Sequence, residues 1–429
     1  MKAMKKTMDK KKTLMYCRSF AKSEYQDKVI IANTENGQTF KLTKECFEIL
    51  DTFISQKVSV EECLSWFEDK DDMKYFETIL GSMNKNGILV SEPEKYEYDI
   101  SCSLTNKCNL RCIHCCADAQ HVSNSDSSDS ELTTQEWKDA FDKLSELKVS
   151  TMSFTGGEPM IRDDFFELTE YARSKIKADY QLMSNSLLIN EGNAKKLTSL
   201  FENFSFSLDG VDEETCAFVR GKGVFDKVMK NVDLMKANGM DSFSLSMTKI
   251  KQNNPHVERF LKLCESVGAK PILRHFDSVG RGKQNIDLMP CTEDEDFAPY
   301  VPEPLDGKKY FASNLLPAGI SCNACTTTFT IGSNGDIFPC NTLQKEQFKL
   351  GNVKDIPSLK DFFEKREYER SEGYRNFCDI HPAKSKKCTD CPVKLHCVTC
   401  VQYCYLQKNN SKCQQYCDRK KKELAVLWD

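Results

Sequence analysis

The sequence contains no long hydrophobic run. A membrane-spanning helix needs about 20 consecutive apolar residues, and no segment approaches that length. The basic N-terminus is not followed by an apolar segment long enough for a secretory signal either. We therefore expect a cytoplasmic protein with no membrane partner.

An excess of positive charge is also absent. The 429 residues include 60 Lys and Arg against 64 Asp and Glu, which gives a formal net charge of -4. Without a basic field the chain has no general attraction for phosphate backbones, so we expect no nucleic-acid partner. The Lys-rich ends, Lys2 to Lys12 and Arg419 to Lys422, are expected to be solvated or frayed tails.

Cysteine, in contrast, is abundant. The chain has 22 cysteines, of which five lie in residues 102–116 and eleven in residues 322–417. In a reducing compartment such groups are unlike a disulfide framework, and metal ligation is their default explanation. The two cysteine-rich segments are therefore candidate metal sites.

The most informative motif is the C-x3-C-x2-C triplet of Cys108, Cys112 and Cys115. Three thiolates at this spacing hold three irons of a cubane cluster and leave the fourth iron open, whereas electron-transfer clusters are closed by four cysteines. An open iron is a binding site for a small molecule. A structural zinc site and incidental buried cysteines remain the alternatives at this point.

Between residues 98 and 278, short apolar segments alternate with amphipathic helical segments. The expected strands are Ile100 to Leu104, Ser150 to Phe154, Tyr180 to Met183, Phe204 to Leu208, Phe243 to Met247 and Pro271 to His275. Six such repeats predict an α/β fold, a partial (β/α)6 TIM-like barrel, with ligands at the carboxyl ends of the strands. The cysteine triplet directly follows the first of these strands.

The segment before the barrel predicts a separate winged-helix-like unit. Strands are expected at residues 29–32 and 39–42 around the turn Glu35-Asn36-Gly37, followed by helices and a closing strand. The expected helices are Lys44 to Ile54, Val60 to Phe67 and Met73 to Lys85, and the closing strand is Gly87 to Val90. This unit is acidic, which favours a peptide ligand over nucleic acid.

Further motifs stand at the ends of the next strands. Gly156-Gly157-Glu158-Pro159 follows the second strand, Ser184-Asn185 the third, and Ser207-Leu208-Asp209-Gly210 the fourth. Together with the cysteine triplet they resemble the radical S-adenosylmethionine (SAM) superfamily. The resemblance implies a [4Fe-4S] cluster on the triplet, with the methionyl amine and carboxylate of SAM on its open iron.

The resemblance also implies which residues contact SAM. Gly157 and Glu158 would contact the methionyl amine, Arg220 the methionyl carboxylate, Ser207 the ribose region, and His114 the surroundings of the adenine. The implied cofactor-binding set is His114, Gly156, Gly157, Glu158, Ser184, Asn185, Ser207, Asp209 and Arg220.

The C-terminal cysteines resemble the SPASM domain of peptide-modifying members, which implies two auxiliary iron-sulfur clusters. The implied ligands are Cys322, Cys325 and Cys340 with Cys400 or Cys404 for one cluster, and Cys388, Cys391 and Cys397 with Cys413 or Cys417 for the other. A zinc ribbon is the structural rival for two C-x2-C pairs.

The N-terminal unit resembles the precursor-recognition element (PqqD-like) of enzymes that mature ribosomally made peptides. A leader peptide would then add to an exposed strand near Val29 to Ala32 and rest against the third helix. The expected domains are a tail at 1–15, the recognition element at 16–95, the radical SAM core at 96–305, the SPASM domain at 306–420 and a tail at 421–429.

The order of these parts looks most like maturases of sactipeptides, which implies a thioether between a Cys sulfur and a carbon of another residue. The implied partners are a precursor peptide and a flavodoxin or ferredoxin-type electron donor. Carbon-carbon crosslinking and epimerisation remain alternatives, the latter needing a cysteine hydrogen donor such as Cys216 or Cys291. A sulfatase-type protein maturase and a metal-bound peptide-binding scaffold are further alternatives.

Overall fold

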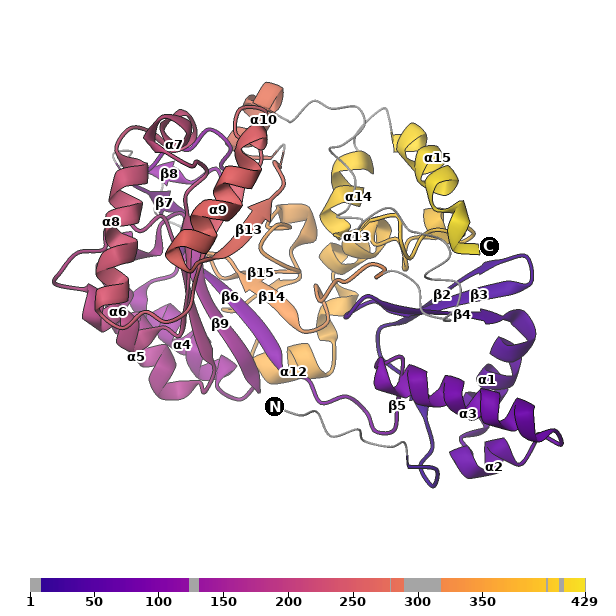
Figure 1. Cartoon of the computed structure of the whole chain (residues 1–429). Coiled ribbons are helices and arrows are strands. Elements are labelled where there is room, and N and C mark those ends of the chain that lie inside the picture. The colour runs from indigo at the N-terminus through magenta and orange to yellow at the C-terminus, as the bar shows by residue number, and fades with distance from the viewer. Residues whose placement is uncertain are drawn as a thin grey trace. The chain divides into compact units, whose positions relative to one another are not determined.

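The computed structural model describes residues 9–122, 131–277, 279–288, 318–398, 400–408 and 413–428 (Figure 1). The chain forms two compact units. Unit 1 consists of Met1–Lys95, Ala298–Asn323 and Phe377–Asp429, and unit 2 of Tyr96–Phe297 and Ala324–Asn376. Among the described helices, none is both long and apolar enough to cross a membrane.

Unit 2 is built on a nine-stranded sheet with the order β13-β12-β11-β10-β9-β6-β14-β15-β16. Its six parallel strands are β6 (Tyr98–Thr105), β9 (Val149–Gly156), β10 (Asp179–Ser184), β11 (Asn203–Ser207), β12 (Phe243–Thr248) and β13 (Lys270–Arg274). They lie within one or two residues of the predicted positions. The predicted α/β partial barrel is therefore confirmed.

Beyond the barrel, the sheet continues into residues from the cysteine-rich region. Strand β14 (Thr328–Ile331) pairs in parallel with β6, β15 (Asp336–Phe338) pairs antiparallel with β14, and β16 (Gly351–Asn352) pairs antiparallel with β15. In unit 2, α12 (Leu359–Glu364) buries Phe363 against Phe329 of β14 and Tyr98 of β6. The part that follows the barrel in sequence is thus anchored on its first strand.

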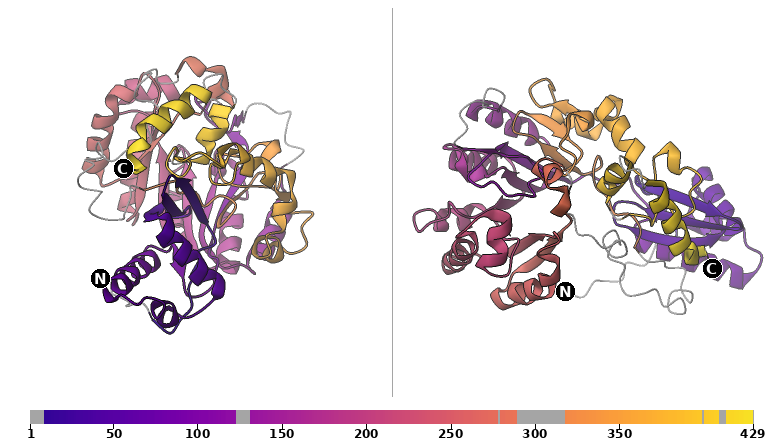
Figure 2. Two further views of the ribbon diagram at one scale, coloured as in Figure 1. Left: turned by 90° about the vertical axis from the view of Figure 1, so that its right-hand side faces the viewer. Right: turned by 90° about the horizontal axis from the view of Figure 1, so that it is seen from above.

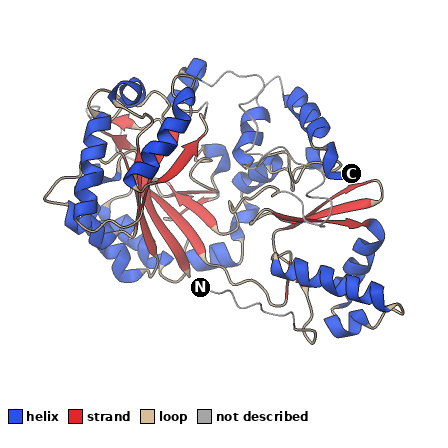
Figure 3. Ribbon diagram, viewed as in Figure 1, coloured by secondary structure: helices blue, strands red, loops and turns tan. Residues whose placement is uncertain are grey.

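Helices flank the parallel strands (Figures 2 and 3). They are α4 (Thr134–Leu144), α5 (Phe165–Lys175), α6 (Ala194–Leu200), α7 (Glu213–Arg220), α8 (Val224–Ala237), α9 (Val257–Val267) and α10 (Arg281–Gln284). A capping box begins α4, since the side chains of Thr133 and Glu136 each accept a hydrogen bond from the other's backbone amide. Trp137 stacks on Phe141 within α4, and Phe141 contacts Phe154 of β9 edge to face.

The first part of unit 1 is a three-stranded antiparallel sheet followed by three helices. The strands are β2 (Phe20–Tyr25), β3 (Lys28–Asn33) and β4 (Gln38–Thr43), the helices α1 (Lys44–Gln56), α2 (Val60–Leu64) and α3 (Lys70–Lys85), and β1 (Met15–Tyr16) pairs with β5 (Leu89–Val90).

The prediction that Val29 to Ala32 form an exposed edge strand is wrong. These residues belong to β3, which is the central strand and pairs with β2 on one side and β4 on the other. Strand β2 was not predicted, because its residues Lys22 and Glu24 are charged and Ala21 and Ser23 are small.

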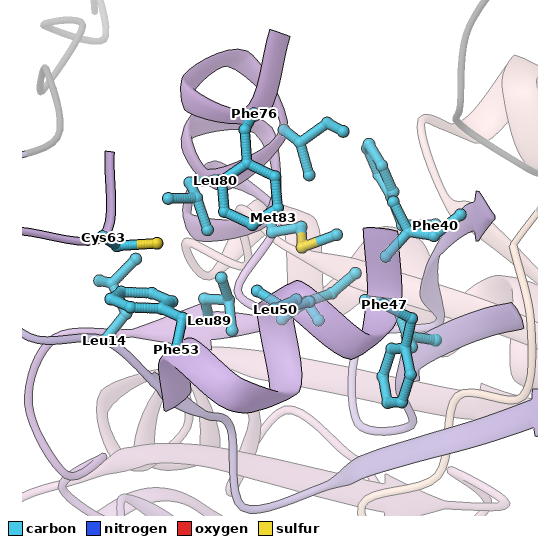
Figure 4. Close-up of a cluster of buried hydrophobic side chains, with 14 of the residues drawn as sticks. Leu14, Phe40, Phe47, Leu50, Phe53, Cys63, Phe76, Leu80, Met83 and Leu89 are labelled. Carbon is cyan, nitrogen blue, oxygen red and sulfur yellow. The ribbon is translucent and has the colours of Figure 1, made fainter. Parts of the chain in front are cut away.

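Strand β3 buries side chains on both faces. Val29 and Ile31 pack with residues of the three helices, including Leu50, Phe53 and Leu80, in the cluster drawn in Figure 4. On the opposite face, Ile30 and Ala32 pack with Leu395, Leu427 and Trp428. A continuous apolar run is what a strand buried on both faces requires.

Short helices complete the C-terminal part of the chain. They are α13 (Glu372–Ile380), α14 (Val401–Lys408) and α15 (Cys413–Glu423), of which α14 and α15 belong to unit 1. Residues near the C-terminus join the sheet of unit 1 through Lys28 and Lys41, whose ammonium groups donate to the carbonyls of Trp428 and Leu427.

Candidate functional site

The cysteine triplet lies in the loop that follows β6, at the carboxyl end of the parallel sheet. The loop begins with β7 (Lys107–Cys108) and returns through β8 (Gln120–His121), which pairs with it. Cys108 and Cys112 are each only 8% exposed, and Cys115 is half-buried. The sequence therefore places the three thiols where a barrel of this kind presents its ligand site.

Hydrogen-bond donors surround the triplet sulfurs. The amide of Leu110 lies 3.4 Å from Cys108 Sγ, Asn185 Nδ2 lies 3.8 Å from the same atom, and Arg220 Nη1 lies 3.7 Å from Cys112 Sγ. Donors of this kind favour the thiolate over the thiol, and they tune the potential of an iron-sulfur cluster. The donor set fits a cluster held by these cysteines.

No three His, Cys, Asp or Glu side chains converge on a single-ion site within the described ranges. A cubane does not need such convergence, because each thiolate binds a different iron. The spacing and the donors around the triplet thus fit a cluster better than a zinc ion.

Gly156 and Gly157 lie where two backbones meet. A Cβ at Gly156 would lie 2.3 Å from the Thr105 carbonyl oxygen, and one at Gly157 would lie 2.2 Å from that of Lys107. The amides of Gly157 and Glu158 donate to these two carbonyls, at 2.7 and 2.8 Å. The glycines therefore allow the end of β9 to hold the start of the cluster loop, and their predicted contact with SAM stays a prediction.

Glu158 is completely buried and joins the ends of two neighbouring strands. Its Oε1 accepts from Ser184 Oγ at 2.9 Å and from the Met160 amide at 3.3 Å, and its Oε2 accepts from the Asn185 amide at 2.8 Å. A carboxylate has about four acceptor positions, so one remains on Oε2. Burial raises the pKa of Glu158 to about 7, which means that the carboxylate lacks a neighbouring cation strong enough to offset its burial. An ammonium group would supply that cation.

The raised pKa of Glu158 predicts a pH-dependent stability. Its folded pKa lies above that of the unfolded chain, so its contribution is fully present below about pH 4.5 and is lost as pH rises through 7. Between pH 5 and pH 8, wild type should therefore lose up to about 3 kcal/mol relative to the Glu158→Gln variant. Anaerobic thermal unfolding of both proteins without SAM measures this difference, and parallel pH profiles would contradict it.

Asp209 is the electrostatic centre of the site. It is 1% exposed, and its Oδ2 lies 2.6 Å from Arg220 Nη2 and 2.5 Å from His114 Nε2, while its Oδ1 accepts from the Thr248 amide. Burial alone would raise the pKa of Asp209, but the charges of Arg220 and His114 hold it well below its usual range. Asp209 thus ties the cluster loop, through His114, to α7, through Arg220.

Backbone geometry supports this position of Asp209. Its φ of +60° is unusual for a residue with a side chain, and a Cβ at the next residue, Gly210, would lie 2.3 Å from the Cys216 amide nitrogen. The Asp-Gly pair therefore makes a turn that no other residue at 210 fits.

Arg220 has one donor without a partner. Its side chain is 8% exposed, its Nη1 faces Cys112 and its Nη2 faces Asp209, but its buried Nε has no hydrogen-bond partner. A buried unpaired donor costs free energy unless a ligand satisfies it. Beside the cluster thiols, a carboxylate is the ligand that fits this donor.

The other predicted contacts are placed as follows. Asn185 Nδ2 donates to Asn109 Oδ1 at 2.7 Å, which links the end of β10 to the cluster loop. Ser184 is engaged by Glu158, as described above. Ser207 ends β11 and is half-buried, and its predicted contact with the ribose region stays a prediction.

Sequence reasoning missed the residues that hold the far side of the cluster loop. Arg281 donates through Nε to the Cys112 carbonyl at 3.1 Å and through Nη1 to the Ala119 carbonyl at 2.6 Å, and its amide donates to Cys115. Asn285 Nδ2 donates to the Ile113 carbonyl at 3.0 Å. Gly280 is the residue that could have indicated this contact, because a Cβ at this position would lie 2.6 Å from the Cys115 carbonyl oxygen.

The predicted auxiliary ligands are divided between the units. Cys325 and Cys340 belong to unit 2, where Cys325 is buried with a φ of +56° and Cys340 Sγ lies 3.3 Å from Thr342 Oγ1. Cys322 and all those from 388 onward belong to unit 1.

Within unit 1, several of these thiols gather around Cys397. Burial raises the pKa of Cys397 well above its ordinary value, and nearby thiols raise it further, in the order Cys404, Cys391, Cys388 and Cys417. Tyr416 of α15 donates to the Cys397 carbonyl at 2.8 Å. The structure thus brings Cys404, as well as Cys417, to the group predicted for the second auxiliary cluster.

Comparison with known proteins agrees with this geometry. The radical SAM superfamily profile matches residues 102–264, and that of the SPASM iron-sulfur cluster-binding domain matches residues 322–392. Mycofactocin maturase MftC of Mycolicibacterium smegmatis is 28% identical over 302 residues, which are 67% of this chain and 74% of that protein. An AdoMet-dependent heme synthase of Oleidesulfovibrio alaskensis is 34% identical over 172 residues, 40% of this chain and 43% of the synthase.

The fold is shared with Streptococcus suis SuiB, whose crystal structure bound to S-adenosylmethionine superposes with a TM-score of 0.52 and 18% identity, covering 92% of this chain and 97% of SuiB. A radical SAM domain binds a [4Fe-4S] cluster and SAM, and a SPASM domain binds auxiliary iron-sulfur clusters. The matched profiles, the cysteine triplet and the barrel together show that the chain contains a radical SAM domain in residues 102–264 and a SPASM domain in residues 322–392.

Proposed function

We propose that the protein is a radical SAM peptide maturase that installs a thioether between a Cys sulfur and a carbon atom of a ribosomally made precursor peptide. The observation that carries the proposal is the polar cradle of Glu158, Asp209 and Arg220 around a three-cysteine loop, in a chain that also has a SPASM domain. The relatives support a peptide substrate, since MftC is named a maturase and SuiB has been solved bound to its precursor peptide SuiA.

The triplet Cys108, Cys112 and Cys115 would hold the SAM cluster. Arg220 would bind the methionyl carboxylate through its unpartnered Nε, and Glu158 would accept from the methionyl amine through its remaining acceptor position. The first role satisfies a buried donor that has no partner, and the second brings a cation to the buried carboxylate of Glu158. Asp209 would act as a positioning residue, because it holds both Arg220 and His114.

When bound, these cofactors would supply one-electron chemistry, namely reductive cleavage of SAM coupled to removal of a hydrogen atom from a C-H bond of the substrate. A thioether then forms with loss of two hydrogens from the peptide, one as that atom and one as the thiol proton. An oxidised auxiliary cluster would take up the remaining electron, and a flavodoxin or ferredoxin-type protein would provide the first one. The chain's own residues bind and orient SAM and the substrate and exclude water.

For the auxiliary clusters, we propose Cys322, Cys325 and Cys340 as ligands of one cluster and Cys388, Cys391 and Cys397 as ligands of the other. Cys400 and Cys404 are the candidates to complete the first cluster, and Cys404 also lies near Cys388, Cys413 and Cys417 of the second group. Cys404, Cys413 and Cys417 then compete for the last position of the second.

We propose residues 16–95 as the recognition element, 96–305 as the radical SAM core and 306–420 as the SPASM domain. Since β3 is central, a leader peptide would add to an edge strand, β2 or β4, by backbone pairing.

Mass spectrometry of the precursor peptide encoded beside the gene tests the proposal, after anaerobic incubation with the enzyme, dithionite and SAM. A thioether predicts a loss of two hydrogens and of one thiol reactive toward iodoacetamide. A carbon-carbon crosslink would give the same mass loss with all thiols retained, and epimerisation would give no mass change. A modified folded protein instead of a peptide would point to a sulfatase-type maturase.

The structure disfavours one route to epimerisation. Cys216 is fully buried, and its Sγ lies 2.8 Å from the Leu208 carbonyl oxygen, so it is a poor hydrogen donor to a bound peptide. Cys291, the other candidate, lies outside the described residues.

A further inference from the structure

In unit 1, the tip of the β3–β4 hairpin holds the chain around Cys322. The Cys322 amide donates to the Thr34 carbonyl at 2.8 Å, the Gly319 amide donates to Gly37 at 2.8 Å, and Ser321 Oγ donates to the Glu35 carbonyl at 2.9 Å. These three hydrogen bonds within four residues fix the backbone of a segment that has no regular secondary structure of its own.

The same sheet holds a second cysteine-bearing segment. Ser23 of β2 is 2% exposed, and its Oγ lies 2.8 Å from the Pro392 carbonyl oxygen and 3.2 Å from that of Cys391. A buried serine whose hydroxyl faces two carbonyls holds that backbone at a fixed position, since breaking such a bond leaves buried acceptors unpaired.

The two segments are also joined to each other. The Ile320 amide donates to the Leu395 carbonyl at 2.7 Å. A Cβ at Gly319 would lie 2.7 Å from that same carbonyl oxygen and 2.9 Å from Thr39 Cγ2 of β4. Gly319 is therefore enclosed between the sheet and the second segment, which leaves little room for either to move.

The hairpin tip is itself rigid. Arg18 binds Glu35 with two hydrogen bonds, Nε to Oε1 at 2.6 Å and Nη2 to Oε2 at 3.1 Å, and both side chains are only 15% exposed. Such a paired contact fixes direction as well as distance. Asn33 and Asn36 tie the other side of the tip to the carbonyls of Gly87 and Asn86.

We propose that the three-stranded sheet of unit 1 is the frame of the auxiliary clusters, with Ser23 and the tip residues Thr34 to Gly37 as positioning elements for the ligands Cys391 and Cys322. The inference rests on the proposed function in one respect, the assignment of these cysteines as cluster ligands. The sheet proposed to receive the peptide is then the same sheet that holds the clusters. Binding of the clusters should therefore stabilise this sheet, because metal binding stabilises the fold that carries the metal's ligands.

The test uses the anaerobically reconstituted full chain and follows iron release to an added chelator. Ser23→Ala and Ser321→Ala should each release the auxiliary iron roughly fivefold faster than wild type, as expected for the loss of one anchoring hydrogen bond. Ser321→Thr keeps the hydroxyl and should restore the wild-type rate. Ser55→Ala is the matched control, since the Ser55 hydroxyl bonds only the Thr52 carbonyl within its own helix.

Hydrogen exchange provides the second readout. Chelation of iron from wild type should speed exchange of residues 318–322 and of the β3–β4 hairpin together, while α3 stays protected. Equal release rates in Ser23→Ala, Ser321→Ala and Ser55→Ala, with no exchange change in the hairpin, would overturn the proposal. The metal content and SAM cleavage of wild type are measured separately. Zinc without SAM cleavage would refute the proposed function. The release rates of the variants, compared for whichever metal is bound, would still decide this inference.

Discussion

Replacing Cys112 by alanine should abolish SAM cleavage while the auxiliary clusters persist. The triplet holds its irons through one thiolate each, so loss of one leaves two anchors for a cluster that already has an open iron. We expect about eight irons per chain in place of about twelve, since each cubane holds about four. Formation of 5'-deoxyadenosine should fall to the background level, as measured by anaerobic liquid chromatography with dithionite as reductant.

Cys116 offers a matched control for this experiment. It follows the triplet by one residue but lies outside its spacing, so Cys116→Ala should keep both the iron content and the cleavage rate. Wild-type rates of cleavage in Cys112→Ala would contradict the assignment of the SAM cluster. Loss of all iron in that variant would show that the three clusters do not assemble independently.

Asp209→Asn should have the second large effect, on both stability and SAM binding. The change removes the charge that pairs with the buried Arg220 and His114, and breaking a buried ion pair from one side costs about 3 to 5 kcal/mol. Released from Asp209, Arg220 would no longer be aimed beside Cys112, so SAM affinity should fall as well. Thermal unfolding and equilibrium dialysis of SAM measure the two effects.

Glu258→Gln is the control for a charge removed from an ion pair in the same unit. Glu258 pairs with Lys262 on the surface of α9, where both side chains are largely exposed, and such pairs contribute little to stability because solvent screens them. We expect wild-type SAM affinity in this variant. An Asp209→Asn protein as stable as Glu258→Gln, with unchanged SAM affinity, would refute the central role given to Asp209.

The parts of the fold that follow local patterns were predictable. Alternating strands and helices located all six barrel strands, and the triplet was expected at the end of the first of them because ligands lie at that end of parallel strands. Strand β2 was missed because its inward residues, Ala21 and Ser23, are small and give no hydrophobic alternation. The contact that explains Ser23 is the hydrogen bond from its hydroxyl to the carbonyl of Cys391, more than 360 residues away in the sequence.

Contacts between the ends of different strands could not be predicted from the sequence for a similar reason. Nothing local to Glu158 indicates that its donors come from Ser184 and Asn185, on the next strand of the barrel. Arg281 likewise reaches back about 170 residues to the carbonyl of Cys112. The motifs identified the residues of the site, whereas only the fold shows which of them bind each other.

The most direct test of the central claim combines iron and sulfide quantitation of the anaerobically reconstituted protein with mass spectrometry of the neighbouring precursor peptide after incubation with dithionite and SAM. We predict about twelve irons, as three cubanes require, together with 5'-deoxyadenosine and a peptide that has lost two hydrogens and one reactive thiol. Zinc in place of iron, with no adenosine product and an unchanged peptide, would contradict the account and leave a metal-bound peptide-binding protein.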